Sequence, residues 1–442
     1  MKRVKVAFHT LGCKVNSYET EAVKTMFEAA SFDVVQENEL SDVTIINTCT
    51  VTNQSAAKSR KIIRQAIKRN PDAIIAVMGC YTQLEPEQVK AISGVDIIIG
   101  TSKRDHLLSY VQTVIKDRQP MLEVEDVTKY KTFDRLSLTH YKDQTRAYLK
   151  IQDGCNQYCT YCIIPFARGP MRSRAKQEVL EEARMLIQNG YQEIILTGIH
   201  TGGYGSDLID TSFTDLCEAL SQLKGLKRLR ISSIEMNQIT PRLLELIQYN
   251  PIFVPHLHIP IQSGANVVLK AMKRHYTTQE FEAKIQSIRT HIPNIAITTD
   301  VMVGFPGETD ADFEETVETL TRIGFSEMHI FPYSKRQGTM ASNMQPQVLK
   351  PIKTLRVQRL LELNRTLAFQ YAKSLKNTFQ TVLFEQCDGV VCQGHTEYYL
   401  TVKVNTESDL SNTLHPVKLT TIDYPEIEAT LVGKSQSPGR LS

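Results

Sequence analysis

QDGCNQYCTYCIIP, residues 152–165, holds three cysteines, Cys155, Cys159 and Cys162, in the spacing C-x3-C-x2-C. Three thiols in one loop cannot all pair as disulfides. Zinc takes four ligands, which usually come from two distant C-x2-C pairs. Three thiolates so close together suit a cubane iron–sulfur cluster that keeps one iron open for another ligand. The alternatives are a structural metal loop or a set of redox thiols.

The bulk composition is that of a soluble globular protein. The chain has 442 residues, of which 41% are hydrophobic and 22% charged, and its net charge is +3. This length suits two or three domains, and a charge this small means that a polyanion must bind through local basic patches. The apolar runs are strand-length and too short to span a membrane, so we expect a cytoplasmic protein. In that compartment thiols stay reduced, and the odd count of nine cysteines also disfavours a disulfide framework.

Residues 1–115 alternate β-branched runs with amphipathic stretches, which predicts repeated βα units. The expected strands are 4–10, 43–47, 73–78 and 96–99. The expected helices are 18–30, 54–69, 85–92 and 103–115. Such a series predicts an α/β fold with an open parallel sheet and helices on both faces.

Three further cysteines, Cys13, Cys49 and Cys80, each lie just beyond the end of an expected strand. In a parallel sheet these carboxyl ends share one edge, where ligands bind. Gly12 and Gly79 would let the backbone turn close to a bulky ligand. The sequence therefore predicts a second three-thiolate site. The alternative is three independent buried cysteines.

Two groups of basic residues are candidates for contact with a polyanion. The first forms one face of the expected helix after Cys49 and consists of Lys58, Lys61, Arg64 and Lys68. Such a stripe is also typical of a solvated helix face. The second lies in residues 131–176, where nine Lys/Arg stand against three Asp, and it consists of Arg168, Arg172 and Arg174. These arginines could instead bind a carboxylate in a pocket or form structural ion pairs.

A second βα series follows a polar stretch at 116–145, which we expect to be a linker. Its expected strands are 146–151, 193–196, 228–232, 257–260, 296–303 and 327–331. Six such units suit a partial β/α barrel whose functional loops lie at the carboxyl ends of the strands. Gly198, Gln262 and Gly304 follow three of these strands, so the barrel mouth suits a polar small molecule beside the cysteine loop. Three histidines near strand ends are expected to serve the core or to orient other groups: His200, His256 and His258.

The last part of the chain begins with a helical stretch at 351–375. Short β-like runs follow at 378–384, 389–393, 398–404, 416–421 and 428–431. They predict a small five-stranded barrel, which binds RNA or caps the structure. Cys387 and Cys392 have no second pair, so we predict no metal there, and Cys217 is expected to be buried.

The C-x3-C-x2-C loop after the first strand of a βα barrel resembles the radical S-adenosylmethionine (SAM) superfamily. The whole chain resembles its methylthiotransferases, through L-G-C-K-V-N at 11–16, I-N-T-C-T-V-T at 46–52, G-C-Y at 79–81, the loop with I-I-P-x-x-R-G up to 169, and P-I-Q-S-G at 260–264. The stretches 11–16 and 196–205 are similar to the MtaB type, which acts on N6-threonylcarbamoyladenosine at position 37 of tRNA. The isopentenyladenosine and ribosomal-protein enzymes differ after the first cysteine.

The resemblance implies three domains: a methylthiotransferase domain at 1–116, a radical SAM barrel at 140–372 and a TRAM domain at 375–440. It implies that Cys155, Cys159 and Cys162 hold a radical-generating 4Fe-4S cluster. It also implies that a second, auxiliary 4Fe-4S cluster supplies the sulfur and is held by Cys13, Cys49 and Cys80. All six cysteines would then be catalytic. SAM is the further cofactor, and its expected contacts are Gly198, Gln262, Gly304 and Arg168.

The implied reaction inserts a methylthio group at C2 of the modified adenosine. The C2 hydrogen is too weakly acidic for a side-chain base at neutral pH, so a carbon radical is needed. The implied partners are the tRNA anticodon loop and an electron donor such as a flavodoxin, without DNA or a membrane. The alternatives are methylthiolation of another tRNA adenosine or of a ribosomal protein, and a non-catalytic iron–sulfur RNA-binding protein, which would lack a SAM pocket.

Overall fold

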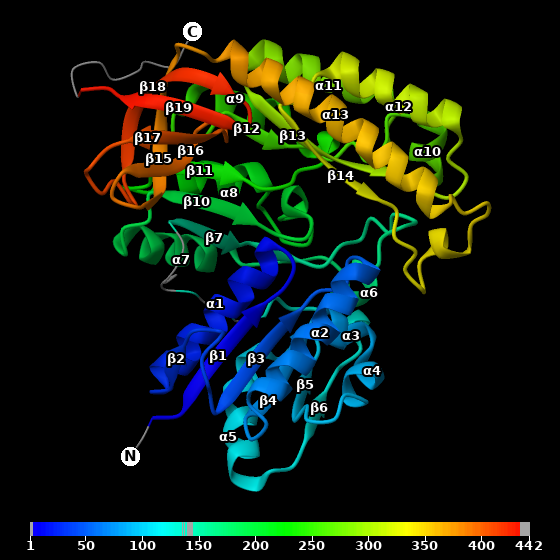
Figure 1. The fold of residues 1–442 in the computed structure, drawn as a ribbon, viewed down its shortest axis with the longest axis vertical. Coiled ribbons are helices and arrows are strands. Elements are labelled where there is room, and N and C mark those ends of the chain that lie inside the picture. Colours follow the sequence, from blue (N-terminus) through cyan, green and yellow to red (C-terminus); the bar gives the residue numbers. More distant parts are fainter. Residues whose placement is uncertain (1–2, 135, 137, 139–144, 434–442) are drawn as a thin grey trace.

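The computed structural model describes residues 3–134, 136, 138 and 145–433. The chain forms an N-terminal α/β sheet, a central barrel of βα units and a C-terminal β-barrel, in that order along the sequence (Figure 1). Within these residues, no helix combines the length and the apolar character that crossing a bilayer requires.

The N-terminal sheet is parallel and has the strand order β2-β1-β3-β4-β5-β6. Its strands are β1 (Lys5–Thr10), β2 (Asp33–Val35), β3 (Val43–Thr48), β4 (Ile74–Gly79), β5 (Ile97–Ile99) and β6 (Met121–Glu123). Its helices are α1 (Lys14–Ala29), α2 (Asn53–Arg69), α3 (Cys80–Leu84), α4 (Pro86–Lys90) and α5 (Leu107–Asp117), with the 3-10 turn η1 (Arg104–His106) before α5. Residues of α1 and α5 pack on one face, and residues of α2 and α4 on the other. The predicted open sheet is confirmed.

The sequence pattern did not predict the two edge strands of this sheet, β2 and β6. The strand β2 is only three residues long, and β6 comes from the stretch that was expected to be a linker. β6 pairs with β5 in parallel, so the sheet continues past residue 116 to Glu123. A strand of three residues is shorter than the run of about four to eight residues over which alternation can be recognised, and therefore leaves little pattern in the sequence.

The central barrel has six parallel strands, as predicted. They are β7 (Arg146–Lys150), β10 (Glu193–Thr197), β11 (Arg228–Ile231), β12 (His256–His258), β13 (Ala296–Val303) and β14 (Glu327–Pro332). They pair as β11-β10-β7 and β12-β13-β14, and a parallel bridge from Ser233 to His258 joins the two sheets. The helices around them are α7 (Lys176–Gln188), α8 (Phe213–Ser221), α9 (Pro241–Tyr249), α10 (Asn266–Ala271), α11 (Thr278–His291), α12 (Asp310–Ile323) and α13 (Lys350–Ser374). The arrangement is an open barrel (Figure 1).

The inner face of this barrel is polar. Side chains alternate along a strand, and Ala147, Leu149, Ile194 and Leu196 belong to the core that the helices share. The positions between them face the inside. These include Arg146, Tyr148, Glu193, Arg228, Arg230, His258, Asp300 and His329. An interior of this composition is suited to a polar ligand rather than to a packed apolar filling.

The C-terminal part is a closed five-stranded barrel with its own core, as predicted. Its strands are β15 (Phe379–Cys387), β16 (Val391–Thr396), β17 (Thr401–Asn405), β18 (Leu414–Asp423) and β19 (Glu426–Leu431). Cys387 lies opposite Cys392 in the β15–β16 register, and the two form a disulfide. The expectation that the cysteines stay reduced is therefore wrong for this pair. Of the expected domain limits, 140 and 440 lie outside the described residues.

Candidate functional site

Cys13, Cys49 and Cys80 meet at one edge of the N-terminal sheet. Cys13 precedes α1, Cys49 follows β3, and Cys80 begins α3 directly after β4. The strands that carry them, β1, β3 and β4, are neighbours in the sheet. Each thiol interacts electrostatically with another of the three. The structure thus brings together the three side chains that the sequence placed at strand ends.

Two glycines make this convergence possible. Gly12 has φ +110°, and a Cβ there would lie 2.9 Å from the Cβ of Cys49. Gly79 has φ +107°, and a Cβ there would lie 2.5 Å from Oδ1 of Asn47. Both positions require a left-handed backbone and leave no room for a side chain. The turns that present Cys13 and Cys80 therefore depend on glycine.

Cys155, Cys159 and Cys162 lie in the loop between β8 (Gln152–Asp153) and α6 (Ile164–Arg168), at the carboxyl end of β7. The backbone N–H of Gln157 donates to the sulfur of Cys155 over 3.4 Å. Arg274 donates to the sulfur of Cys159 over 3.7 Å. Such donors stabilise thiolates and the negative charge of an iron–sulfur cluster. The sequence analysis missed Arg274, because its segment carries no motif.

The spacing of the thiols tests what they could hold. Among the described residues, the only three potential metal ligands within 4.8 Å of one another include no cysteine. A tetrahedral zinc with Zn–S bonds of about 2.3 Å would hold its thiolates about 3.8 Å apart. A cubane binds each thiolate through a different iron and therefore spreads them more widely. Each set offers three free thiols, which suits a cubane that keeps one iron open.

Burial keeps two thiols of the loop, those of Cys155 and Cys162, protonated until a metal binds. Burial raises the pKa of Cys155 to about 11 and that of Cys162 to about 12. A metal ion releases such protons, because the thiolate is the ligand. Burial likewise raises the pKa of Cys80, although the Arg168 guanidinium beside it acts in the opposite direction.

Arg168 joins the two cysteine sites. It ends α6, directly after the cysteine loop, and its Nε donates to the sulfur of Cys80 over 3.2 Å. Its other nitrogens donate to Glu19 at 2.5 Å and to Asn16 at 2.7 Å, both on α1. The side chain is fully buried. Arg168 thus lies at the three-cysteine edge of the N-terminal sheet.

A buried ion-pair network surrounds Arg168. Glu19 accepts from Lys150 at 2.7 Å and pairs with Arg104 at 2.7 Å. Burial alone would raise the pKa of Glu19, but Arg104, Arg168 and Lys150 lower it to about 2. Asp153 also pairs with Lys150, at 2.6 Å. Arg104 has a further carboxylate partner, Asp134 at 2.7 Å, so each cation of the network is paired. The network fixes α1 against the start of the central barrel.

The arginines after the loop were candidates for a polyanion contact, and the structure contradicts this. Arg168 is fully buried, and Arg172 and Arg174 are 4% and 5% exposed. Arg172 donates to backbone carbonyls, and Arg174 donates to Glu182 at 2.6 Å. The alternative, structural pairing, is correct. The other candidate group is exposed and forms no ion pair within the described part of the chain: Lys58, Lys61, Arg64 and Lys68.

Three of the four expected SAM contacts, Gly198, Gln262 and Gly304, follow β10, β12 and β13, at the same end of the barrel as the cysteine loop. The fourth, Arg168, is fully buried and donates to the N-terminal domain instead. Gln262 is 8% exposed, and its Oε1 has no hydrogen-bond partner among the described residues. A Cβ at Gly198 would lie 3.0 Å from Oε1 of Gln152. The amide of Gly304 already donates to Glu308 at 3.0 Å. Of these three expected contacts, Gln262 is the one whose side chain offers an unused polar atom to a ligand.

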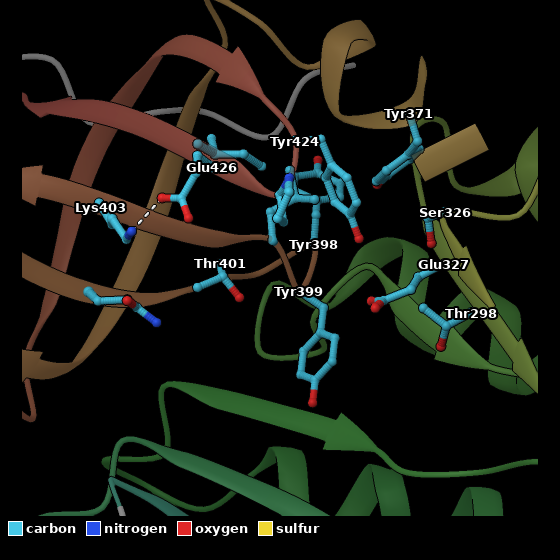
Figure 2. A pocket seen from close by; sticks show the side chains of 14 residues that line it. Thr298, Ser326, Glu327, Tyr371, Tyr398, Tyr399, Thr401, Lys403, Tyr424 and Glu426 are labelled. Atoms are coloured by element: carbon cyan, nitrogen blue, oxygen red, sulfur yellow. Dashed lines mark hydrogen bonds and ion pairs between the residues drawn. The ribbon is translucent and has the colours of Figure 1, made fainter. Parts of the chain in front are cut away.

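The opposite end of the barrel is closed by Tyr399 of the C-terminal barrel. Its ring stacks on His256 with centroids 4.7 Å apart, and the guanidinium of Arg230 lies 4.9 Å from it. A pocket of about 310 Å³ between the two barrels lies beside this ring (Figure 2). His256 is the first residue of β12, so this pocket lies at the strand starts, away from the cysteine loop.

Comparisons with known proteins agree with this architecture. Residues 149–320 match the radical SAM superfamily, and residues 5–100 match the family described as uncharacterized protein family UPF0004. The solved structure of the radical SAM methyltransferase TsrM from Kitasatospora setae, with cobalamin and a [4Fe-4S] cluster bound, has a TM-score of 0.57 at 13% identity, covering 89% of this chain and 81% of that one. This likeness supports the fold.

Curated relatives resemble the chain along its whole length. The threonylcarbamoyladenosine tRNA methylthiotransferase MtaB of Bacillus subtilis is 45% identical over 97% of this chain and 96% of its own. The protein of the same name from Thermotoga maritima is 35% identical over 90% and 91%. The tRNA-2-methylthio-N(6)-dimethylallyladenosine synthase of Carboxydothermus hydrogenoformans is 32% identical over 96% and 98%. The chain belongs to the radical SAM methylthiotransferase family, with MtaB-type proteins among its relatives.

Proposed function

We propose that this protein methylthiolates tRNA, at C2 of N6-threonylcarbamoyladenosine at position 37. The observation that carries the proposal is the pair of three-cysteine sites joined through Arg168, which ends the helix after one set and donates to Cys80 of the other. The full-length identity to the Bacillus subtilis MtaB protein supports the choice of nucleoside.

The two three-cysteine sites have different parts in the proposed reaction. When bound, the cofactors supply two things. One is a carbon radical, which removes the C2 hydrogen, and the other is the sulfur atom that replaces this hydrogen. Cys155, Cys159 and Cys162, at the barrel mouth, would hold one 4Fe-4S cluster. Cys13, Cys49 and Cys80 would hold the other. Arg274 and the amide of Gln157 donate to the sulfurs of the first site, and Arg168 donates to the second. The free Oε1 of Gln262 is available to orient SAM.

The partners follow from the reaction. The cleavage of SAM needs one electron, for which we propose a donor such as a flavodoxin. The substrate is the anticodon loop of tRNA, which places the reaction in the cytoplasm. The exposed cations of α2, Lys58, Lys61, Arg64 and Lys68, are suited to contact the phosphate backbone.

Nucleoside analysis tests the proposal. Bulk tRNA from a strain that lacks the gene is digested and examined by mass spectrometry, beside tRNA from the parent and from a strain with the gene restored. We expect the 2-methylthio form of threonylcarbamoyladenosine to disappear in the deletion strain and to return on complementation. Unchanged tRNA nucleosides together with a mass loss in a ribosomal peptide would refute the proposal and support the ribosomal-protein alternative.

A further inference from the structure

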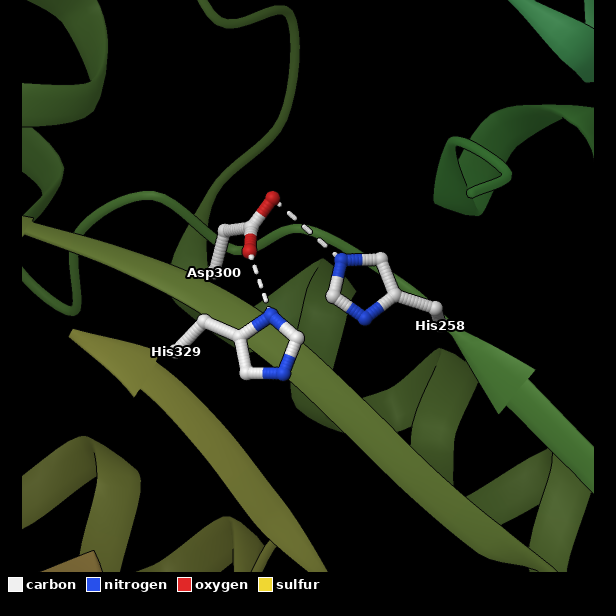
Figure 3. Close-up of side chains that lie close together, drawn as sticks. All are labelled: His258, Asp300 and His329. Atoms are coloured by element: carbon white, nitrogen blue, oxygen red, sulfur yellow. Dashed lines mark ion pairs between the residues drawn. The ribbon is translucent and has the colours of Figure 1, made fainter. Parts of the chain in front are cut away.

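Three side chains on the inner face of the barrel form a compact group (Figure 3). Asp300 of β13 lies between two histidines, 3.2 Å from Nε2 of His258 and 3.4 Å from Nδ1 of His329. Nδ1 of His258 lies 2.9 Å from the hydroxyl of Thr298. Two histidines and a carboxylate resemble a metal site by residue type. Their surroundings point to another ligand.

The surroundings of this group are positively charged. Lys14, at the start of α1, interacts electrostatically with Asp300 and also with Arg146 and Arg230. His256, the next histidine of the same barrel, interacts with Lys14 and Arg230 too. The Lys14 ammonium beside Asp300 repels a divalent metal ion and attracts an anion instead.

No hydrogen bond or ion pair among the described residues accounts for the position of Lys14. It is exposed, and it forms no hydrogen bond or ion pair within the described part of the chain. It is the first residue of α1, a helix of 16 residues, where the macrodipole disfavours a cation. Arg146 and Arg230 add repulsion. An anion beside its ammonium would remove all of these costs.

The two arginines have unused donors. Arg230 is 1% exposed and donates to Glu193 at 2.6 Å, yet its Nη1 has no partner among the described residues. Arg146 pairs with Glu385 at 3.1 Å, and its Nη1 also lacks a partner there. Each arginine thus has one carboxylate and one free nitrogen. Buried donors without partners are costly, so a ligand acceptor is expected near them.

We propose that Lys14, with Arg230 and Arg146 behind it, binds the carboxylate of the threonylcarbamoyl group of the substrate nucleoside. This inference rests on the proposed function. The threonyl carboxylate is the one anionic group that distinguishes this nucleoside from an adenosine with an apolar N6 substituent. It lies a few bonds from N6, and Lys14 adjoins Cys13 of the site that delivers sulfur to C2. The same active site can therefore hold both ends of the modified base.

The test uses two short anticodon stem-loop RNAs that differ in one group. Both carry N6-threonylcarbamoyladenosine, one as the free acid and the other as its methyl ester. Dissociation constants are measured by fluorescence anisotropy on the reconstituted protein, and KM and kcat of methylthiolation are measured separately. We expect the unsubstituted protein to bind the acid about 10- to 100-fold more tightly than the ester, as for a charge-assisted hydrogen bond.

Three variants locate the effect. Lys14→Gln should lose most of the preference for the acid over the ester, because only Arg230 and Arg146 remain, with the loss in KM rather than in kcat. Lys14→Arg should keep the preference. Lys24→Gln removes a lysine of the same helix that pairs with Glu21 at 2.6 Å, and should behave as the unsubstituted protein. Iron content checks that each variant holds its clusters.

The two proposals fail in different ways. If the unsubstituted protein methylthiolates other adenosines but not the acid RNA, the proposed function is wrong. If it methylthiolates the acid RNA but Lys14→Gln keeps the full acid preference, or if no protein distinguishes acid from ester, the assignment of Lys14 is wrong and the proposed function stands.

Discussion

Arg168 donates its Nε hydrogen to the sulfur of Cys80 over 3.2 Å, although 88 residues separate them. The contact crosses from the central barrel to the N-terminal sheet. It places the segment after one set of three cysteines against a member of the other set. The segment after the cysteine loop of the barrel therefore packs against the sheet edge that carries the other three cysteines.

Removing Arg168 should weaken the junction of the first two domains. In Arg168→Ala, Glu19 and Asp153 lose a buried partner, which costs about 3–5 kcal/mol of unfolding free energy. The unfolding free energy of Arg168→Lys should lie between those of Arg168→Ala and the parent protein, because an ammonium keeps the charge but not the planar arrangement of donors. Urea unfolding measures both. Arg242→Ala, which removes an exposed partner of Asp215, is the control and should change little. An Arg168→Ala protein as stable as the parent would contradict the role of the network.

Gly12→Ala should disrupt the auxiliary site alone. The added methyl group would meet Cys49, since the Cβ positions are 2.9 Å apart. After anaerobic reconstitution we expect about four irons per chain instead of about eight, from one four-iron cluster instead of two. Gly190→Ala is the matched control, because Gly190 also has positive φ, +91°, but nothing lies within 4 Å of an added Cβ. A Gly12→Ala protein with full iron would show that Gly12 is not needed there.

His256 should make stability depend on pH. Burial, then Arg230 and His258, lowers its folded-state pKa well below 6.5. Below about pH 6.5 the unfolded chain therefore binds a proton that the folded chain does not. Stability falls as the pH drops, by up to about 1.4 kcal/mol per pH unit from this group. His256→Gln should reduce the slope of unfolding free energy between pH 5 and 7. An unchanged slope would contradict the buried neutral histidine.

Tyr399 should hold the C-terminal barrel against the central one. Tyr399→Ala removes the ring that Arg230 and Arg146 contact, at 4.9 Å and 5.7 Å from its centroid, which costs about 2 kcal/mol. The rate of backbone amide hydrogen exchange should then rise in β16 and β17. Tyr399→Phe keeps the ring and should exchange as the parent does. Equal exchange in all three proteins would mean that other contacts hold the barrels together.

The sequence predicted much of the fold because its periodic signals are strong. All six strands of the central barrel and the five of the C-terminal barrel were expected within a few residues of their observed bounds. The same pattern located Cys13, Cys49 and Cys80 at one sheet edge. It failed for β2 and β6, whose pairing depends on neighbouring strands rather than on their own residues.

The parts of the site that depend on tertiary contacts were not predictable. The positive charge of Arg168 suggested contact with a polyanion. Its pairing with Glu19 depends on the packing of α1 against the barrel, which the sequence does not show. The pairing of Asp300 with His258 and His329 required the register of three strands. The disulfide between Cys387 and Cys392 also follows from register, which no spacing rule supplies.

The most direct test of the division of labour is a pair of triple variants assayed for two products. Cys155, Cys159 and Cys162→Ala should form neither 5′-deoxyadenosine nor methylthiolated RNA. Cys13, Cys49 and Cys80→Ala should keep about half of the iron and still form 5′-deoxyadenosine, but transfer no sulfur. If this second variant is folded, holds that iron and yet forms no 5′-deoxyadenosine, or if it still methylthiolates RNA, the assignment of roles to the two sites is contradicted.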